Sequence, residues 1–259
     1  MKTKSLIRKL ASYFPKREKD SFDFVGLMVP PYKAETNRIL LCLDFDESIL
    51  KEALSFKPDL IITHHPFFFG NKKEILAYNK ERERCYLALR EAHIPLTSYH
   101  TNFDRAKGGM NDLLAKKLNL QNIHPLISEN MARGGSLEKA MPIQEFAHYV
   151  LKCLNADYGT LIAEGKKLIK TVAIIGGGGS REFTRALEEG YDIYISGDCP
   201  HHVRREIILS HYNYLDLPHE IESIFMEGMT KILLNIDQSL TIKSINHERV
   251  PYLITNDSK

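Results

Sequence analysis

Residues 59–70 read Asp59-Leu-Ile-Ile-Thr-His-His-Pro-Phe-Phe-Phe-Gly70. A short apolar run that is rich in β-branched residues and ends near a proline predicts a buried strand over residues 60–63. His64 and His65 then stand at the end of this strand, and imidazole is the commonest metal ligand in proteins. Neighbouring side chains on a strand point to opposite faces, so the pair favours two adjacent ions or a backbone turn. The alternative is two polar residues at a strand-to-loop transition.

The surrounding sequence alternates between strand and helix patterns. Apolar runs predict strands over residues 38–44 and 95–100, which come before and after the strand at residues 60–63 in the sequence. Helices are expected over residues 3–14, 47–55, 74–92 and 111–118. Strands that alternate with helices at this spacing predict an α/β domain with a largely parallel sheet.

A second, similar α/β unit is predicted in the C-terminal half, so the fold class is two α/β units with mixed, largely parallel sheets. Its strands are expected over residues 171–175, 191–196 and 214–216, and its helices over 143–154, 181–190 and 200–210. Segment 125–140 is the expected crossing, because the sheet pattern lapses there and glycines occur. A helix after Pro218 and a strand within 236–242 are expected to return to the first unit. The predicted domains are therefore residues 1–125 plus 217–259, with most of the candidate metal ligands, and residues 126–216.

Composition excludes several classes of protein. A formal net charge of +2 gives no argument for a nucleic-acid or anionic-membrane partner. No stretch approaches the ~20 apolar residues of a membrane helix, and the N-terminus lacks the apolar core of a signal peptide. A cytoplasmic protein is expected. Cys42, Cys85, Cys153 and Cys199 stand singly, which argues against a cysteine zinc site or a disulfide framework. Most of them are expected to be core thiols.

Further candidate metal ligands lie at other element ends. Asp104 follows the strand at residues 95–100, and in open α/β sheets ligands bind outside the carboxyl ends of the strands. A turn-capping aspartate before Gly108 is the alternative. His219 and Glu222 lie three residues apart at a predicted helix start, where they share a face. Acidic residues are favoured at a helix start in any case, but this gives no reason for His219.

Together these residues offer three imidazoles and two carboxylates. Mixed nitrogen and oxygen ligands favour zinc, iron or manganese over calcium or magnesium. Five side chains suit two divalent ions ~3.5–4 Å apart, and Asp104 is the simplest bridge between them. His100 is expected to orient a metal ligand, or else to be a buried strand histidine.

Two other features carry weaker hypotheses. The run Gly176-Gly-Gly-Gly-Ser180 lies at a strand-to-helix junction, where Gly176 and Gly177 could contact a phosphate group. It has neither a Walker lysine nor a dinucleotide-binding pattern, so a structural turn is the alternative. His201 and His202 begin a predicted helix and are candidates for proton transfer, or are simply exposed.

The motifs along the chain resemble those of one family. Ser21-Phe-Asp-Phe-Val-Gly-Leu27 is similar to its WDNxGL stretch, with Phe22 and Phe24 replacing the usual residues. Residues 59–68 resemble its DLIIxHHP block, and His100-Thr-Asn-Phe-Asp104 with Gly108-Gly-Met-Asn-Asp112 resembles its HTNxD and GGxND blocks. The glycine run and Ser196-Gly-Asp198 match two of its turns. Nearly end to end, the chain resembles the NIF-three-like (YbgI) family of two-metal proteins, whose members are often called GTP cyclohydrolase 1 type 2.

The resemblance implies the NIF-three-like fold, a ring-shaped homohexamer built as a trimer of dimers, and a shared set of metal ligands. The ligands fall on His64, His65, Asp104, His219 and a following glutamate. The family pattern GHYxxE has this glutamate four residues after the histidine, whereas position 223 here is serine. Glu220 and Glu222 are the candidates, and Glu222 is preferred because it shares the helix face with His219.

The implied function is a metal-dependent GTP cyclohydrolase of pterin and folate biosynthesis. The enzyme would convert GTP and water to formate and 7,8-dihydroneopterin triphosphate, beginning with attack of hydroxide on C8 of guanine. On charge type alone, Lys107, Arg133 and Arg204 are candidates for binding the triphosphate. Two alternatives are a two-metal phosphoesterase or other nucleotide hydrolase, and a non-catalytic metal-binding protein with a role in assembly or regulation.

Overall fold

The computed structural model describes residues 1–249, 251 and 254. The chain divides into two compact units. The first comprises Met1–Gly109 and Ser223–His247, and the second comprises Met110–Glu222 and Glu248–Lys259. Each unit contains one mixed sheet with helices, which confirms the predicted α/β class. Among the described residues, no helix is both long enough and apolar enough to cross a membrane.

The boundaries of the units differ from those expected. Residues 110–125 and 217–222 belong to the second unit. In particular, β5 (Gln121–Pro125) pairs antiparallel with β6 (Arg133–Pro142), so segment 125–140 is largely sheet and not a crossing. The glycines that obscured this strand have a packing role, because a Cβ at Gly134 would overlap the hydroxyl of Tyr191.

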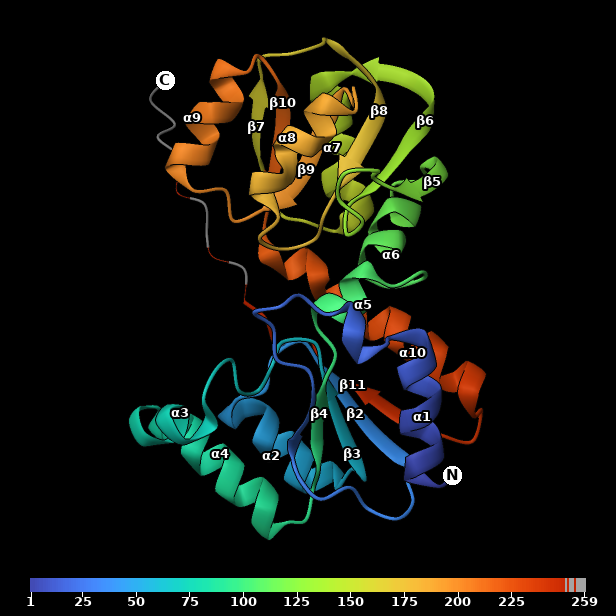
Figure 1. The fold of residues 1–259 in the computed structure, drawn as a ribbon, viewed down its shortest axis with the longest axis vertical. Coiled ribbons are helices and arrows are strands. Elements are labelled where there is room, and N and C mark those ends of the chain that lie inside the picture. Colours follow the sequence, from blue (N-terminus) through green and yellow to red (C-terminus); the bar gives the residue numbers. More distant parts are fainter. Residues whose placement is uncertain (250, 252–253, 255–259) are drawn as a thin grey trace. The chain divides into compact units, whose positions relative to one another are not determined.

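The first unit is built on a five-stranded sheet in the order β1-β4-β3-β2-β11 (Figure 1). The four strands from β4 to β11 run parallel, and β1 pairs antiparallel with β4 at the edge. The carboxyl ends of β2, β3 and β4 therefore meet at one edge of the sheet. The strands are Gly26–Val29 (β1), Arg38–Cys42 (β2), Leu60–Thr63 (β3), Leu96–Ser98 (β4) and Thr241–Ser244 (β11).

Helices cover both faces of this sheet, with α2 and α4 on one face and α1 and α10 on the other (Figure 1). The single helix expected over residues 74–92 is two helices, because Asn79 is extended and its side chain accepts the N–H of Arg82 at 2.9 Å as an N-cap. The helices are Thr3–Tyr13 (α1), Lys16–Glu18 (η1, a 3₁₀ turn), Glu47–Phe56 (α2), Lys72–Tyr78 (α3), Lys80–Glu91 (α4), Thr101–Arg105 (α5) and Ile224–Ile236 (α10).

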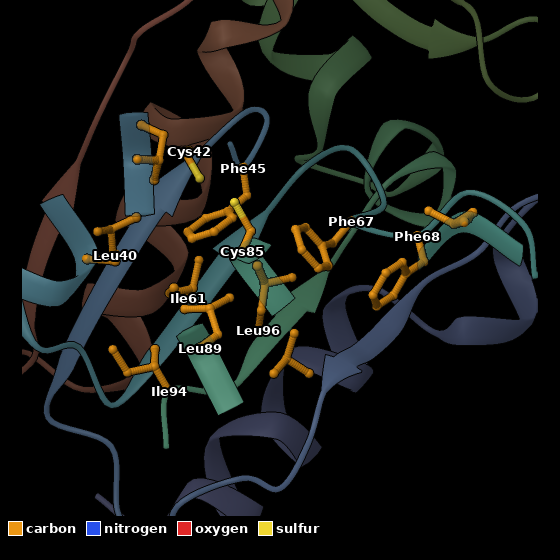
Figure 2. Packing of buried hydrophobic residues seen from close by; sticks show 14 residues of the cluster. Leu40, Cys42, Phe45, Ile61, Phe67, Phe68, Cys85, Leu89, Ile94 and Leu96 are labelled. Atoms are coloured by element: carbon orange, nitrogen blue, oxygen red, sulfur yellow. The ribbon is translucent and has the colours of Figure 1, made fainter. Parts of the chain in front are cut away.

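One apolar core of the first unit lies between the strands and α2 and α4 (Figure 2). Alternate strand residues such as Leu40 and Ile61 pack against Leu89 of α4, and Phe67 and Phe68 close the core beyond β3. Full burial of one such side chain contributes roughly 1.5–3 kcal/mol. The core thus holds the loop that follows β3 in place.

The second unit is built on a six-stranded sheet in the order β5-β6-β8-β9-β10-β7 (Figure 1). Its central strands β8, β9 and β10 run parallel, so their carboxyl ends also share an edge. The remaining strands are Thr160–Ala163 (β7), Leu168–Ile174 (β8), Ile193–Gly197 (β9) and Asn213–Leu217 (β10). The helices are Met110–Lys117 (α6), Ile143–Leu154 (α7), Ser180–Glu182 (η2), Phe183–Glu188 (α8), His201–Leu209 (α9) and His219–Ser223 (η3).

Asp192, which precedes β9, provides a stability test for the second unit. Its carboxylate is 6% exposed and accepts the N–H groups of Lys170 and Thr171 at 2.8 Å and the ammonium of Lys166 at 2.6 Å. We expect Asp192→Ala to lower the free energy of unfolding by about 1–3 kcal/mol at pH 7, because two backbone donors lose their acceptor. Chemical denaturation measures this loss, and Asp157→Ala on an exposed site is the control.

The loss should depend on pH. Burial raises the pKa of Asp192, but the hydrogen bonds from Lys166, Thr171 and Lys170 outweigh it and hold the pKa below its usual value. The stabilisation is therefore complete above the unfolded pKa of about 3.9 and is lost as the pH falls through the folded pKa. A difference between the wild type and Asp192→Ala that does not shrink in acid would contradict this account.

Candidate metal-binding site

Histidines gather at the carboxyl edge of the first sheet. His64 and His65 directly follow β3, and the backbone bends at both residues. Their N–H groups donate to the carbonyl oxygens of Cys42 at 3.3 Å and Leu43 at 3.1 Å, which continues the pairing with β2. His100 follows β4 and precedes α5. Parallel strands thus deliver all three histidines to one edge.

The three imidazoles form one cluster. A ring nitrogen of each of His64, His65 and His100 lies within 4.8 Å of one from each of the others. The ring centroid of His64 is 5.0 Å from that of His65 and 5.1 Å from that of His100. The bend therefore brings the two adjacent histidines together, and His100 belongs to the group that could hold an ion. This extends the role expected for His100, which was to orient another ligand.

Each ring of the cluster is held through its Nδ1 atom. All three Nδ1 atoms face an oxygen that can only accept: the carbonyl of Tyr99 for His64 (2.9 Å), Asp44 Oδ2 for His65 (2.5 Å) and Asp23 Oδ1 for His100 (2.8 Å). A neutral imidazole in this setting carries its proton on Nδ1 and leaves the Nε2 lone pair for a metal ion. Metal-ligating histidines in proteins are supported in the same way, by a carbonyl or carboxylate oxygen at the other ring nitrogen.

The two supporting carboxylates are ionised at neutral pH. Burial raises the pKa of Asp23, but the hydrogen bonds from His100 and Thr101 outweigh it and bring the pKa to about 2. Burial likewise raises the pKa of Asp44, and the hydrogen bond and charge of His65 hold it below its usual value. Both side chains can therefore accept a hydrogen bond from the Nδ1–H group of their histidine.

Asp104 on α5 lies against the same cluster. It is 7% exposed, and its Oδ1 lies 3.5 Å from Nε2 of the fully buried His64. Two ligand atoms about 2.1 Å from a tetrahedral ion are about 3.4 Å apart, so this spacing suits a shared ion. The carboxylate and the imidazole are therefore placed so that both could ligate one ion.

The second unit carries its own histidine and carboxylates. His219 begins η3, directly beyond β10, and its Nδ1 lies 2.5 Å from Asp198 Oδ2. Its Nε2 lies 3.0 Å from Oε2 of Glu222, which is 4% exposed. A 3₁₀ helix has three residues per turn, so the side chains at positions 219 and 222 are aligned. This geometry favours Glu222 over Glu220 as the candidate ligand beside His219. It also explains how a glutamate three residues after the histidine, instead of four, can lie next to its ring.

The charges around His219 favour a cation. The hydrogen bonds that the protonated ring donates to Asp198 and Glu222 raise the pKa of His219 to about 11, although burial opposes this shift. Two carboxylates therefore stabilise a positive charge on or near this ring. A divalent ion in place of the Nε2 proton would meet the same favourable field.

The glycine run has a packing role in the second unit. Gly177 has a positive φ of 62°, and a Cβ at this position would overlap Glu222 Oε1 and lie 3.2 Å from Cε1 of His219. The N–H of Gly176 donates to Asn111 Oδ1 at 2.7 Å. Gly177 thus makes room for Glu222 and His219, and Gly176 binds Asn111 through its N–H, which are different roles from the expected phosphate contact.

The structure gives Arg133 a role other than phosphate binding. The side chain is almost fully buried, and its Nε donates to Asp112. Its Nη1 donates to the carbonyl oxygens of Asn130 and Met131 at 2.8 and 2.9 Å. The guanidinium therefore ties the start of β6 to its own unit, which corrects the prediction made from its charge.

The other predicted site residues lie outside both ligand groups. His201 and His202 are exposed in the first turn of α9, and His202 Nε2 lies 3.4 Å from an Nη atom of Arg181. Lys107 and Arg204 are exposed as well. These placements do not assign a proton-transfer role to either histidine, and they leave the two cations accessible to an anion.

The supporting aspartates were missed at the sequence level. Asp44 follows β2 and Asp198 follows β9, at the carboxyl ends of parallel strands. The same rule that singled out Asp104 would have found both of them. Asp23 lies in a loop before β1, where the strand-end rule does not apply, but it stands at the aspartate of the WDNxGL stretch, and that position could have singled it out.

Comparison with known proteins agrees with the motif reading. The family model Duf34/NIF3 (NGG1p interacting factor 3) matches residues 1–251. A protein of Clostridium perfringens named GTP cyclohydrolase 1 type 2 homolog is 32% identical over 225 residues, which cover 85% of this chain and 86% of that protein. A Lactococcus lactis protein of the same name is 29% identical over 256 residues, with 97% and 99% of the two chains covered.

The fold agrees as well. The crystal structure of a Bacillus cereus protein related to NIF3 superposes with a TM-score of 0.88 at 20% identity and covers 98% of this chain and 99% of its own. At this identity the likeness shows the fold alone, and family membership rests on the family model that matches residues 1–251. The chain belongs to the Duf34/NIF3 (NGG1p interacting factor 3) family.

Proposed function

We propose that the protein binds two divalent metal ions through His64, His65, Asp104, His219 and Glu222. The observation that carries this proposal is the shared support of the histidines. His64, His65, His100 and His219 each turn Nδ1 toward a carbonyl or carboxylate oxygen. That support fixes the ring and its tautomer for ligation through Nε2. The imidazole of His100 is a further ligand, and the mixed donor set favours zinc, iron or manganese.

We further propose that the metal-loaded protein is a GTP cyclohydrolase, which releases formate and forms 7,8-dihydroneopterin triphosphate. The names of the relatives at 32% and 29% identity support this reaction. Activation of water at neutral pH is the chemistry that bound divalent ions supply. The chain's own residues hold the ligand rings in place, and the exposed side chains of Lys107 and Arg204 are available to a triphosphate. By family resemblance, we propose that the protein assembles as a homohexamer.

The direct test is turnover of GTP. Protein loaded separately with zinc, iron or manganese is incubated with GTP and assayed for formate and for pterin fluorescence. We expect both products from the wild type and neither from His64→Ala or Asp104→Ala. His148→Ala, which removes an exposed histidine of α7, is the matched control and should retain full activity.

The formate assay and a parallel assay of phosphate release together separate the alternatives. Phosphate release from other esters by the loaded wild type, without formate, would replace the cyclohydrolase proposal with a two-metal phosphoesterase. Metal binding without turnover of any substrate would indicate a role in assembly or regulation.

Metal content gives a second prediction that does not depend on activity. We expect about two ions per chain in the wild type, and fewer in both His64→Ala and His219→Ala, measured by elemental analysis after dialysis against the metal. The decrease follows because each variant loses an imidazole ligand. A metal content that stays at the wild-type level in both variants would contradict the ligand assignment.

A third prediction concerns Gly177. We expect Gly177→Ala to weaken zinc binding by at least about 10-fold, since its Cβ displaces the carboxylate of Glu222. Competition with a chromophoric chelator measures the affinity. Gly178→Ala is the matched control, because the nearest atom to its Cβ is an oxygen of Asp198 at 3.6 Å. Equal affinities in the two variants would refute the role given to Gly177.

A further inference from the structure

The first unit carries an exposed cluster of three aromatic rings beside its histidines. Phe22, Phe24 and Phe69 are 62%, 40% and 54% exposed. The ring centroid of Phe69 lies 6.4 Å from that of Phe22, 5.6 Å from that of Phe24 and 6.4 Å from that of His100. Contiguous exposed apolar side chains of this size indicate a binding surface.

The cluster is held outward by its neighbours in sequence. Phe67 and Phe68 are buried in the core of the first unit (Figure 2). Phe69 is the one phenylalanine of this run that is exposed. The other two rings flank Asp23, which is 3% exposed. The geometry of the cluster therefore follows from the core on one side and from a buried carboxylate on the other.

The loop that bears Phe22 and Phe24 is tied down at Asp23. The Asp23 carboxylate accepts the hydroxyl of Thr101 at 2.5 Å and the N–H of Phe24 at 2.6 Å, and it lies 2.8 Å from His100 Nδ1. Its carbonyl oxygen accepts the ammonium of Lys19 at 2.6 Å. One side chain thus orients a candidate metal ligand and fixes the position of the aromatic rings. This is preorganisation of the kind that lowers the entropic cost of binding.

We propose that Phe22, Phe24 and Phe69 form a stacking platform for a purine base. Aromatic faces bind bases by stacking, with little dependence on charge. The platform has no formal charge, so it suits the base of a nucleotide and not its phosphates. The contact between Phe69 and His100 places a stacked base next to the imidazole cluster. This inference rests on the proposed function, for which it names the group that recognises the substrate.

The spacing of the rings favours a purine over a pyrimidine. Phe22 and Phe24 lie 6.4 and 5.6 Å from Phe69 between ring centroids, and their rings are tilted by 50° and 65° to its ring. A planar base therefore stacks on one ring and meets the others at its edge, and a fused two-ring base offers a larger face and a longer edge for these contacts than a single-ring base. Stacking energies add roughly per contact, so guanosine should bind more tightly than cytidine.

The test uses metal-free full-length protein and the nucleosides guanosine and cytidine, which carry no phosphate and cannot be turned over without metal. Affinities come from ligand-observed NMR titration. We expect Phe69→Leu, which keeps an apolar side chain but removes the aromatic face, to weaken guanosine binding by about 5- to 50-fold. Phe24→Leu should act in the same direction, and Tyr78→Ala on α3, which removes a ring that is 74% exposed, should have no effect.

The outcomes distinguish this proposal from the proposed function. Guanosine affinity that is unchanged in Phe69→Leu and Phe24→Leu overturns the platform, even if the metal-loaded enzyme turns over GTP. A loss of affinity in both variants supports the platform, even if no GTP is consumed. A change of oligomeric mass in the two variants, with guanosine affinity unchanged, overturns the proposal and assigns the rings to contacts between copies of the chain.

Discussion

The hydrogen bond from an imidazole Nδ1 to a fixed oxygen is the interaction on which the candidate site depends. In the first unit it recurs at His64, His65 and His100, and each acceptor is itself held by the sheet or by a buried loop. It sets the tautomer and the direction of each ring before any ion arrives. Parallel strands supply the other requirement, because their carboxyl ends bring side chains from distant parts of the sequence to one edge.

The second unit meets the same requirements with different residues. His219 follows β10, Asp198 follows β9 and holds its ring, and Glu222 is aligned by a 3₁₀ turn. Gly177 provides the space that Glu222 occupies. Each unit thus presents imidazole and carboxylate groups on a preformed support, and such preformed groups avoid the entropic cost of ordering a site around the ion.

Local sequence patterns predicted those elements of the structure that depend mainly on residues close together in the sequence. The apolar run before His64 and the strand before Asp104 identified two neighbouring strand ends, and the α/β class followed from alternation. The pattern did not reveal β6, because Gly134 is required by the approach of Tyr191, a residue distant in sequence. The buried role of Arg133 was likewise hidden, since its charge suggested an anion and only the fold shows its contact with Asp112.

The most direct test of the account is a crystal structure of the zinc-loaded protein, with anomalous scattering recorded on both sides of the zinc edge. The account predicts anomalous density about 2.1 Å from Nε2 of His64, His65 or His100, with each Nδ1 still bonded to its oxygen. Zinc density only at surface residues remote from these histidines, His219 and Glu222 would contradict it.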